Sequence, residues 1–310
     1  MGKTKRQHYV PRTYLKRFSF DGKRLHTFLI SKDIPSIINS SNYGNFVKDI
    51  SLADACVSQE YYTIDETNPT YNRGLNAMSL EKEFFQDFAE PKLSSIIRLF
   101  ENLASKILSD NNQVASINFS DEQLYDLALS TFIQYHRSPR LRHPIESVNS
   151  LIKHVLKTRL LENGASDVEN IKGLDVAFTH ADKTYLNPYL WRIFCQKLHS
   201  YCILLRVSTN GNFLTSDNPV VIHKLGVKGK ECFNVNFYKD DFLIFFPLTP
   251  NLMLEYYPQD FPDALQMDKT ISIVGWEYEQ QVNKYQYINA EKFIFSHKND
   301  FSLFLKPILR

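Results

Sequence analysis

Apolar residues recur at helical spacing through the middle of the chain. Ser79 is placed to cap a helix whose apolar positions run from Phe84 to Phe100, and Pro91 should kink or split that helix. Ser120 is placed to cap a second helix with acidic residues in its first turn. Further helices are predicted at about residues 145–162, 187–201 and 276–291, with a little helix inside the loop 163–184.

The pattern changes to short apolar runs of strand length after residue 200. A buried strand is predicted over 201–207, and a hairpin joins 241–246 to 251–255 through the turn 247–250. Shorter strands are expected at 60–64, 213–216 and 220–223, with 293–295 as an edge strand.

This separation of helices and strands predicts an α+β fold. We expect the helical middle segment to pack with a mostly antiparallel sheet built from residues near the start and from 201–255. Apolar residues make up 43% of the chain, which is enough for a sizeable core, and no repeat or linker interrupts it. Residues 1–310 are therefore predicted to form a single domain.

The first stretch of the chain is expected to dock onto the body. Pro11 suits a first helical turn, so residues 8–18 are predicted to form a short helix, with Tyr14, Leu15 and Phe18 on one apolar face. A hairpin over 16–30 is the competing possibility, because Asp21-Gly22 is a turn signal.

Charge is concentrated at this same end. Residues 1–24 hold eight basic residues against Asp21 alone, a local net +7, which leaves −5 on the rest because the whole chain carries +2. A basic end on a mildly acidic body fits either a partner with phosphates or an end docked on the body's own carboxylates.

The four cysteines have no CxxC spacing, which is typical of a reduced cytoplasmic protein. The basic start is followed by no apolar segment of the signal-peptide kind. No apolar run approaches the ~18 residues that a membrane span requires. We therefore expect a cytoplasmic protein that does not associate with membranes.

His8 and Arg12 are the first candidate site residues. His8 is either an acid/base or metal ligand beside Arg12, or it joins Tyr9 in tying the first helix down by hydrogen bonds. Both interpretations stay open at this point.

The helix from Ser79 carries candidate carboxylates for a site, Glu81, Glu83 and Glu90. Glu83 and Glu90 are seven residues apart and share an α-helical face, with Asp87 between them. The alternative is an ordinary solvated face.

The densest polar cluster follows the second helix. Gln134, Arg137 and Arg140 come at three-residue spacing, and guanidinium groups bind phosphate or carboxylate with paired hydrogen bonds. Cations at a helix C-terminus are also expected from its dipole without any function. Arg137 and His143 fit the loose Arg-x(4–6)-His pattern of metal-independent RNases, although Pro139 interrupts it.

Asp217 lies between two predicted strands in Thr215-Ser216-Asp217-Asn218-Pro219. It either shapes an Asx-type turn or serves as a metal ligand or a partner for an arginine. No GxGxxG, GxxxxGK[ST], HExxH or GxSxG motif is present, and no zinc site of standard spacing.

Several stretches, taken in order, resemble the bacterial domain-of-unknown-function family 4238. The most specific are Gln7-His8-x-Val10-Pro11-x-x-Tyr14-Leu15-x-x-Phe18 and the Ser-Asp-x-Pro motif at 216–219. The weaker ones are the helix with Glu81 and Glu90, Gln134-x-x-Arg137-x-Pro139-x-x-Arg142, and the stretches 246–250 and 283–290. The resemblance covers nearly the whole chain. It implies that His8, Arg137 and Asp217 belong to one assembled pocket, and it implies no particular reaction.

We expect a nuclease-like effector of a phage-defence or toxin system that acts on RNA or DNA. His8, Arg137 and Asp217 would be catalytic, and Arg12, Arg140 and Gln134 would bind phosphate. Glu90, Asp217 and Glu83 would hold a divalent metal ion, Mg²⁺ or Mn²⁺. The alternative is a binding module that recognises a nucleotide, a phosphorylated ligand or a protein partner without cleavage. A third possibility is a buried network that only pins the N-terminus to the helical core.

Overall fold

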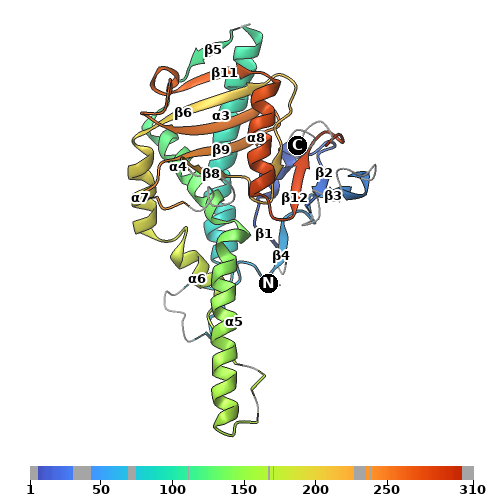
Figure 1. Cartoon of the computed structure of the whole chain (residues 1–310), viewed down its shortest axis with the longest axis vertical. Helices are drawn as coiled ribbons and strands as arrows, with labels where there is room; N and C mark the ends of the chain where they lie inside the picture. Colours follow the sequence, from blue (N-terminus) through green and yellow to red (C-terminus); the bar gives the residue numbers. More distant parts are fainter. Residues whose placement is uncertain are drawn as a thin grey trace.

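The computed structural model describes residues 6–30, 43–68, 75–110, 112–166, 168–169, 171–226, 235–237 and 239–301. Within these residues the chain has an α+β fold, as the sequence predicts (Figure 1). Its strands form a six-stranded, a four-stranded and a two-stranded sheet. The strands near the start were expected to share one sheet with residues 201–255. They build the two smaller sheets instead, and of the described strands in 201–255 only Thr215–Ser216 joins them there.

The largest sheet is antiparallel except where β11 runs parallel to β6. The predicted hairpin is present and longer than expected, because β9 and β10 extend to the turn at 250–251. The strands, in spatial order, are β5 (Val114–Ser116), β11 (Thr270–Val274), β6 (Tyr201–Ser208), β10 (Leu252–Pro258), β9 (Phe242–Thr249) and β8 (Val221–Lys224).

The two faces of this sheet are covered by different helices. Side chains alternate along a strand, so in β10 Leu254 joins the main core while Glu255 and Tyr257 face the other side. Helix α8 (Trp276–Asn289) covers that second side (Figure 1). The main core receives side chains from several helices, among them α3 (Glu90–Ser109), α4 (Asp121–His136) and α7 (Pro188–Leu198).

The four-stranded sheet joins the two ends of the described chain. Its order is β3 (Val47–Ser51), β2 (Arg24–Leu29), β12 (Phe293–Ser296) and β7 (Thr215–Ser216). The expected edge strand 293–295 is therefore an inner strand, paired with β2 on one side and β7 on the other. The competing hairpin over 16–30 is wrong, because β2 pairs with β3 and β12.

The first stretch docks onto the body, as predicted. Arg6–His8 form strand β1, Arg12–Leu15 form helix α1, and a 3₁₀ turn follows over Lys16–Phe18. Helix thus begins only after Pro11, later than residue 8. Tyr14 is buried, and its hydroxyl donates to the Pro247 carbonyl oxygen at 2.5 Å.

Strand β1 pairs with β4 (Val57–Gln59). A strand was expected at 60–64, but these residues form turns and loop. Cys56 and Glu60 on either side of β4 have left-handed backbone, with φ of 51° and 49°. Such conformations are costly for residues other than glycine, and the reversal at Glu60 ends the strand before the expected segment.

Three basic residues of the first stretch pair with carboxylates of this chain. These exposed or half-exposed pairs contribute little stability each. They nevertheless show that much of the local positive charge is matched within the protein. The pairs are Arg6–Asp54 at 2.5 Å, Arg17–Glu101 at 3.2 Å and Arg24–Asp21 at 2.9 Å.

Helix α5 (Pro139–Glu162) projects from the body (Figure 1). It starts earlier than the predicted residue 145 because Pro139 is accommodated in its first turn. Its root packs against α6 (Val176–Lys183), whereas Leu151 and Leu160 farther along are 61% and 42% exposed.

Three cysteines of the described residues, Cys56, Cys195 and Cys202, are free thiols, and Cys232 lies outside those residues. Among the helices that the structure describes, none has the length and hydropathy to cross a membrane.

Candidate functional site

The helix that carries the predicted carboxylates opens with a ten-residue π-helix, Leu80–Ala89. Its hydrogen bonds span five residues, as between the Phe84 amide and the Ser79 carbonyl at 3.0 Å. Pro91 lies in the first turn of α3, where its missing N–H is tolerated. The helix changes from π to α type between Ala89 and Glu90 without a break, because both residues keep helical backbone, so it is not split at this proline. π-Helical segments are rare and occur often at functional sites.

The wider turn changes which carboxylates face inward. Phe85 is buried and Glu81 and Glu90 are partly buried, whereas Glu83 is exposed and accepts a hydrogen bond from Asn76 at 3.1 Å. At α-helical spacing Glu83 would share a face with Glu90. The π-helix places Glu81 there instead, which corrects the expected pair.

Arg137 is buried at the centre of this region, 2% exposed. Nε donates to the Tyr62 hydroxyl at 3.1 Å, Nη1 to Glu90 Oε1 at 3.0 Å, and Nη2 to the His8 carbonyl oxygen at 2.7 Å. The Phe85 ring centroid lies 4.0 Å from its Cζ atom, which is cation–π geometry. Every nitrogen of the guanidinium therefore has a partner within the protein.

Arg137 reaches this position because two helices meet there. Helix α4 begins with a capping box of Ser120 and Gln123 and ends at His136, so Arg137 caps its C-terminus. The Ser138 side chain then caps α5 by accepting from the Arg140 amide at 3.3 Å. The joint between the helices thus directs Arg137 into the core.

The residues that follow Arg137 form hydrogen bonds to distant segments of the chain. Ser138 donates a hydrogen bond to the Asn218 side chain, and Arg142 donates to the Tyr61 carbonyl oxygen. Arg140 Nη1 donates to Asn289 Oδ1 at 3.0 Å. Residues 137–142 therefore fasten five separate segments of the chain.

Glu81 is the carboxylate with the most unusual surroundings. Its Oε2 atom is buried and has no hydrogen-bond partner among the described residues. Burial raises the pKa of Glu81 to about 7, while Arg137 acts in the opposite direction and Glu90 adds to the rise. A carboxyl with this pKa exchanges protons near neutral pH.

His8 is only partly buried and is held by its ring. Nε2 lies 3.2 Å from the Leu52 carbonyl oxygen, and since a carbonyl can only accept, Nε2 carries the hydrogen. Burial lowers the pKa of His8, with Arg12 and Arg137 adding to this effect. In the neutral ring Nδ1 is then the basic nitrogen.

Among the described residues, no hydrogen bond or ion pair joins the Asp217 carboxylate to His8, Glu90 or Arg137. This carboxylate is 1% exposed and accepts hydrogen bonds from the amides of Glu291, Lys292 and Phe293 at 2.9, 2.7 and 3.3 Å. Burial raises the pKa of Asp217 to about 7 against the effect of these three bonds. The residue fixes the passage from α8 to β12, which favours a structural role over the expected catalytic one.

The residues expected to bind phosphate lie in three different environments. Gln134 is buried, and its Nε2 atom has no partner among the described residues. Arg140 pairs with Asn289, while Arg12 is exposed and no hydrogen bond or ion pair holds it in the described part of the chain.

The structure does not assemble the expected Arg137–His143 pair or the expected metal-binding carboxylates. Arg137 is buried beside Glu90, whereas His143 is exposed and lies 3.5 Å from Glu291, so the RNase-like pair is separated. Glu83, Glu90 and Asp217 each bind different protein groups. The residues that the structure describes contain no cluster of three His, Cys, Asp or Glu side chains suited to a metal ion.

Residues 6–300 match a family model described as a protein of unknown function, DUF4238. The chain belongs to this family. No curated protein and no solved structure matches it. The motifs that suggested the DUF4238 resemblance include His8, Glu90 and Arg137, which the structure brings together. They also include Asp217, whose carboxylate binds the main chain after α8 instead.

In this DUF4238 chain the sequence pattern named Glu81 among the carboxylates of the helix but did not select it for the site, and it did not single out Tyr62. Glu83 was selected as the partner of Glu90 because α-helical spacing was assumed. Pro91 was the available signal, since it forbids a normal hydrogen bond at that point. Tyr62 was assigned to a strand, and nothing local to it indicates an arginine partner from far along the chain.

The cluster offers two titratable groups around one buried cation. His8 and Glu81 each interact with the same two charged residues, Arg137 and Glu90. One is a base that is neutral at pH 7, and the other is an acid that is half protonated there. Such a pair can perform general acid–base chemistry on a substrate that reaches both.

Proposed function

We propose that the chain is a nuclease-like hydrolase of RNA or DNA, with His8 and Glu81 as its acid–base pair. The observation that supports this is that two titratable side chains share the same charged neighbours, Arg137 and Glu90: burial raises the pKa of Glu81 to about 7 and lowers the pKa of His8, whose ring is therefore neutral at pH 7. Nδ1 of His8 would accept a proton from the attacking water or hydroxyl, and Glu81 would protonate the leaving oxygen. This assignment replaces Arg137 and Asp217 as catalytic groups.

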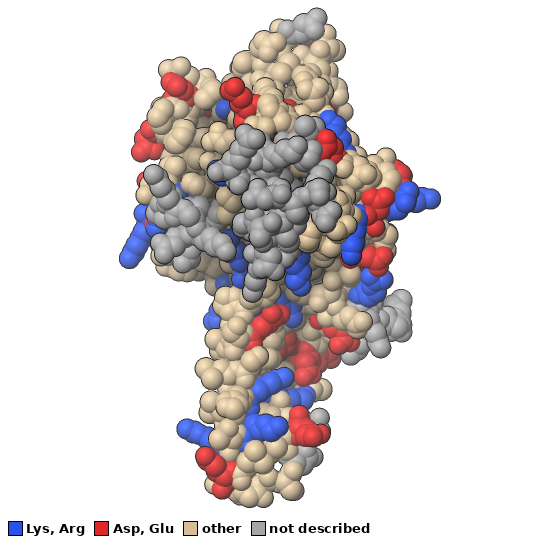
Figure 2. Space-filling view, turned by 45° about the vertical axis from the view of Figure 1, so that its right-hand side comes forward, with Lys and Arg blue, Asp and Glu red and all other residues tan. Residues whose placement is uncertain are grey.

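Phosphate recognition falls to Arg12 in this proposal. Arg12 is exposed, has no ion-pair partner in the described residues, and interacts electrostatically with His8. Basic and acidic side chains are interspersed over the face shown in Figure 2, which favours a local contact over a broad nucleic-acid surface.

A divalent ion remains part of the proposal. Glu81 and Glu90 are the carboxylates near one another, and Mg²⁺ or Mn²⁺ between them would compete with Arg137 for Glu90. A role in phage defence or a toxin system, and a cytoplasmic location, are proposals that follow from the same expectation of nuclease activity.

The test is degradation of end-labelled single- and double-stranded oligonucleotides by the purified chain, with EDTA, Mg²⁺ or Mn²⁺. Glu81→Gln and His8→Ala should each lower the cleavage rate by ~10²–10⁴-fold. Glu83→Gln, on the exposed face of the same π-helix, is the matched control and should cleave normally. Equal losses in the Glu81 and Glu83 variants, or no cleavage by the wild type under any of these conditions, would refute the proposal.

A binding module without catalysis is the second candidate. It is favoured by the hydrogen bonds within the protein that occupy the Arg137 guanidinium and the Asp217 carboxylate, because groups held in this way are not available to a reacting substrate. In that case oligonucleotides or nucleotides bind without being cleaved, and Arg12→Ala weakens binding measured by fluorescence anisotropy. Lys157→Ala, on the projecting part of α5, is the control.

A further inference from the structure

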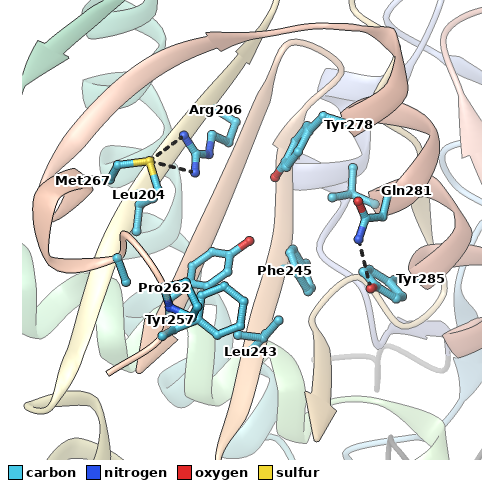
Figure 3. A pocket seen from close by; sticks show the side chains of 13 residues that line it. Leu204, Arg206, Leu243, Phe245, Tyr257, Pro262, Met267, Tyr278, Gln281 and Tyr285 are labelled. Atoms are coloured by element: carbon cyan, nitrogen blue, oxygen red, sulfur yellow. Dashed lines mark hydrogen bonds between the residues drawn. The ribbon is translucent and has the colours of Figure 1, made fainter. Parts of the chain in front are cut away.

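A cavity of about 290 Å³ lies on the face of the six-stranded sheet that α8 covers (Figure 3). Leu204, Leu243 and Phe245 of the sheet form part of its wall, and Met267 closes one side. The volume is close to the lower end of the ~300–1,000 Å³ typical of small-molecule sites. None of the residues in the Arg137 cluster takes part in it.

Five aromatic rings contribute to the lining of this cavity. Phe245 and Tyr285 are stacked with centroids 5.1 Å apart, and Tyr257 meets Phe245 edge-on at 6.2 Å. Phe261 lies 4.9 Å from Tyr257, and Tyr278 comes from α8 on the opposite side. Rings at several angles offer both stacking and edge contacts to a flat guest.

Arg206 supplies a charged donor with spare capacity. Nε donates to Glu255 Oε2 at 2.9 Å and Nη1 to Ser272 Oγ at 2.6 Å. Among the described residues, the hydrogen-bond partner of Nη2 is the Met267 sulfur alone, at 3.8 Å. Sulfur is a weak acceptor, so this nitrogen can donate to an oxygen placed in the cavity.

Two further groups on this face favour an oxygen-bearing guest. The Tyr278 hydroxyl is buried and has no hydrogen-bond partner among the described residues, and it points into the cavity in Figure 3. Glu255, which balances Arg206, is fully buried, and burial raises its pKa to about 7. At neutral pH the Arg206 charge is therefore only partly compensated.

We propose that this cavity binds a planar aromatic molecule of about nucleobase size that carries a carbonyl or carboxylate oxygen. The ring lies among Phe245, Tyr257 and Tyr285, and its oxygen accepts hydrogen bonds from Arg206 Nη2 and the Tyr278 hydroxyl. The site is independent of the proposed nuclease activity, and either can fail without the other.

Calorimetric titration with three probes tests the proposal. Hypoxanthine and purine differ by one carbonyl group, so hypoxanthine should bind at least about fivefold more tightly, the value of one hydrogen bond. 2-Naphthoate tests whether a carboxylate is preferred to a carbonyl. Saturable binding of hypoxanthine or 2-naphthoate is the expected result.

Variants then locate the site. Tyr278→Phe should weaken binding of the oxygen-bearing probes about fivefold, and Gln281→Trp at the exposed rim should block entry. Tyr287→Phe, on the same helix outside the cavity, is the control for both. Failure of hypoxanthine and 2-naphthoate alike to bind, or equal binding to the wild type and the Gln281 variant, overturns the proposal.

Discussion

Nη2 of Arg137 donates a hydrogen bond at 2.7 Å to the main-chain carbonyl oxygen of His8, 129 residues earlier in the sequence. The bond joins the C-terminus of α4 to the first strand. The same guanidinium pairs with Glu90 at the start of α3. One buried cation therefore holds the N-terminal stretch and two helices in register, and the position of the His8 ring depends on it.

Arg137→Ala should destabilise the fold by ~3 kcal/mol, because it leaves Glu90 and the His8 carbonyl without their partner in a largely buried site. Urea unfolding followed by circular dichroism measures the loss. Arg12→Ala removes an exposed arginine of the same region and should change the free energy of unfolding by less than about 0.5 kcal/mol. Similar stability of the two variants would mean that Arg137 does not hold the N-terminal stretch and the two helices together.

Glu81→Gln should alter how stability depends on pH. The folded-state pKa of about 7 is above the ordinary 4.5, so the folded protein holds this proton more tightly than the unfolded chain. The wild type therefore loses stability as the pH rises from about 4.5 to about 7. The expected loss is ~1–3 kcal/mol, because solvent screening reduces the effect of a partly exposed carboxyl.

The variant lacks this loss, so its stability relative to the wild type should rise over the same pH window. The difference isolates Glu81 from Asp217 and Glu255, whose pKa values are also raised. A constant difference across this window would contradict the raised pKa.

Asp217→Asn should destabilise the protein by ~2 kcal/mol, because one amide oxygen cannot serve three donors and the new NH₂ group faces them. The loss should appear as faster hydrogen exchange at the amides of Glu291 and Lys292. Asp87→Asn, on an exposed position of the π-helix, should leave both stability and exchange unchanged. If the Asp217 variant kept its stability and lost nucleic-acid cleavage instead, the catalytic interpretation would be restored.

Local signals predicted much of the fold. The capping residue Ser120, with acidic residues after it, predicted the start of α4. The spacing of Tyr14, Leu15 and Phe18 predicted that the N-terminal stretch docks on the body. Pairing between distant strands could not be predicted in this way. Phe293–Ser296 looked like an edge strand, because nothing near it indicates that β2 and β7 lie on either side.

The candidate site was predictable in part. His8, Glu90 and Arg137 are chemically distinctive side chains, and the structure brings them together. Glu83 was selected instead of Glu81 because the number of residues per turn was assumed to be that of an α-helix. Asp217 was assigned to the same site because it lies between two predicted strands in one of the family motifs. Its observed partners are main-chain amides, which cannot be predicted from the side chains of the sequence.

The projecting helix α5 implies a gradient of local stability along one continuous element. Near its root Arg142 is buried, and farther on Asn149 accepts from the Leu174 amide at 2.8 Å. Beyond Leu151 the apolar side chains of Val155, Leu156, Leu160 and Leu161 are 40–50% exposed, so packing within the described residues opposes fraying less there than at the root. Amide protons should therefore exchange progressively faster from the root to the tip, and the last turns should open without disturbing the body. The arm would then behave as a separate cooperative unit, able to change its order while the sheets stay folded.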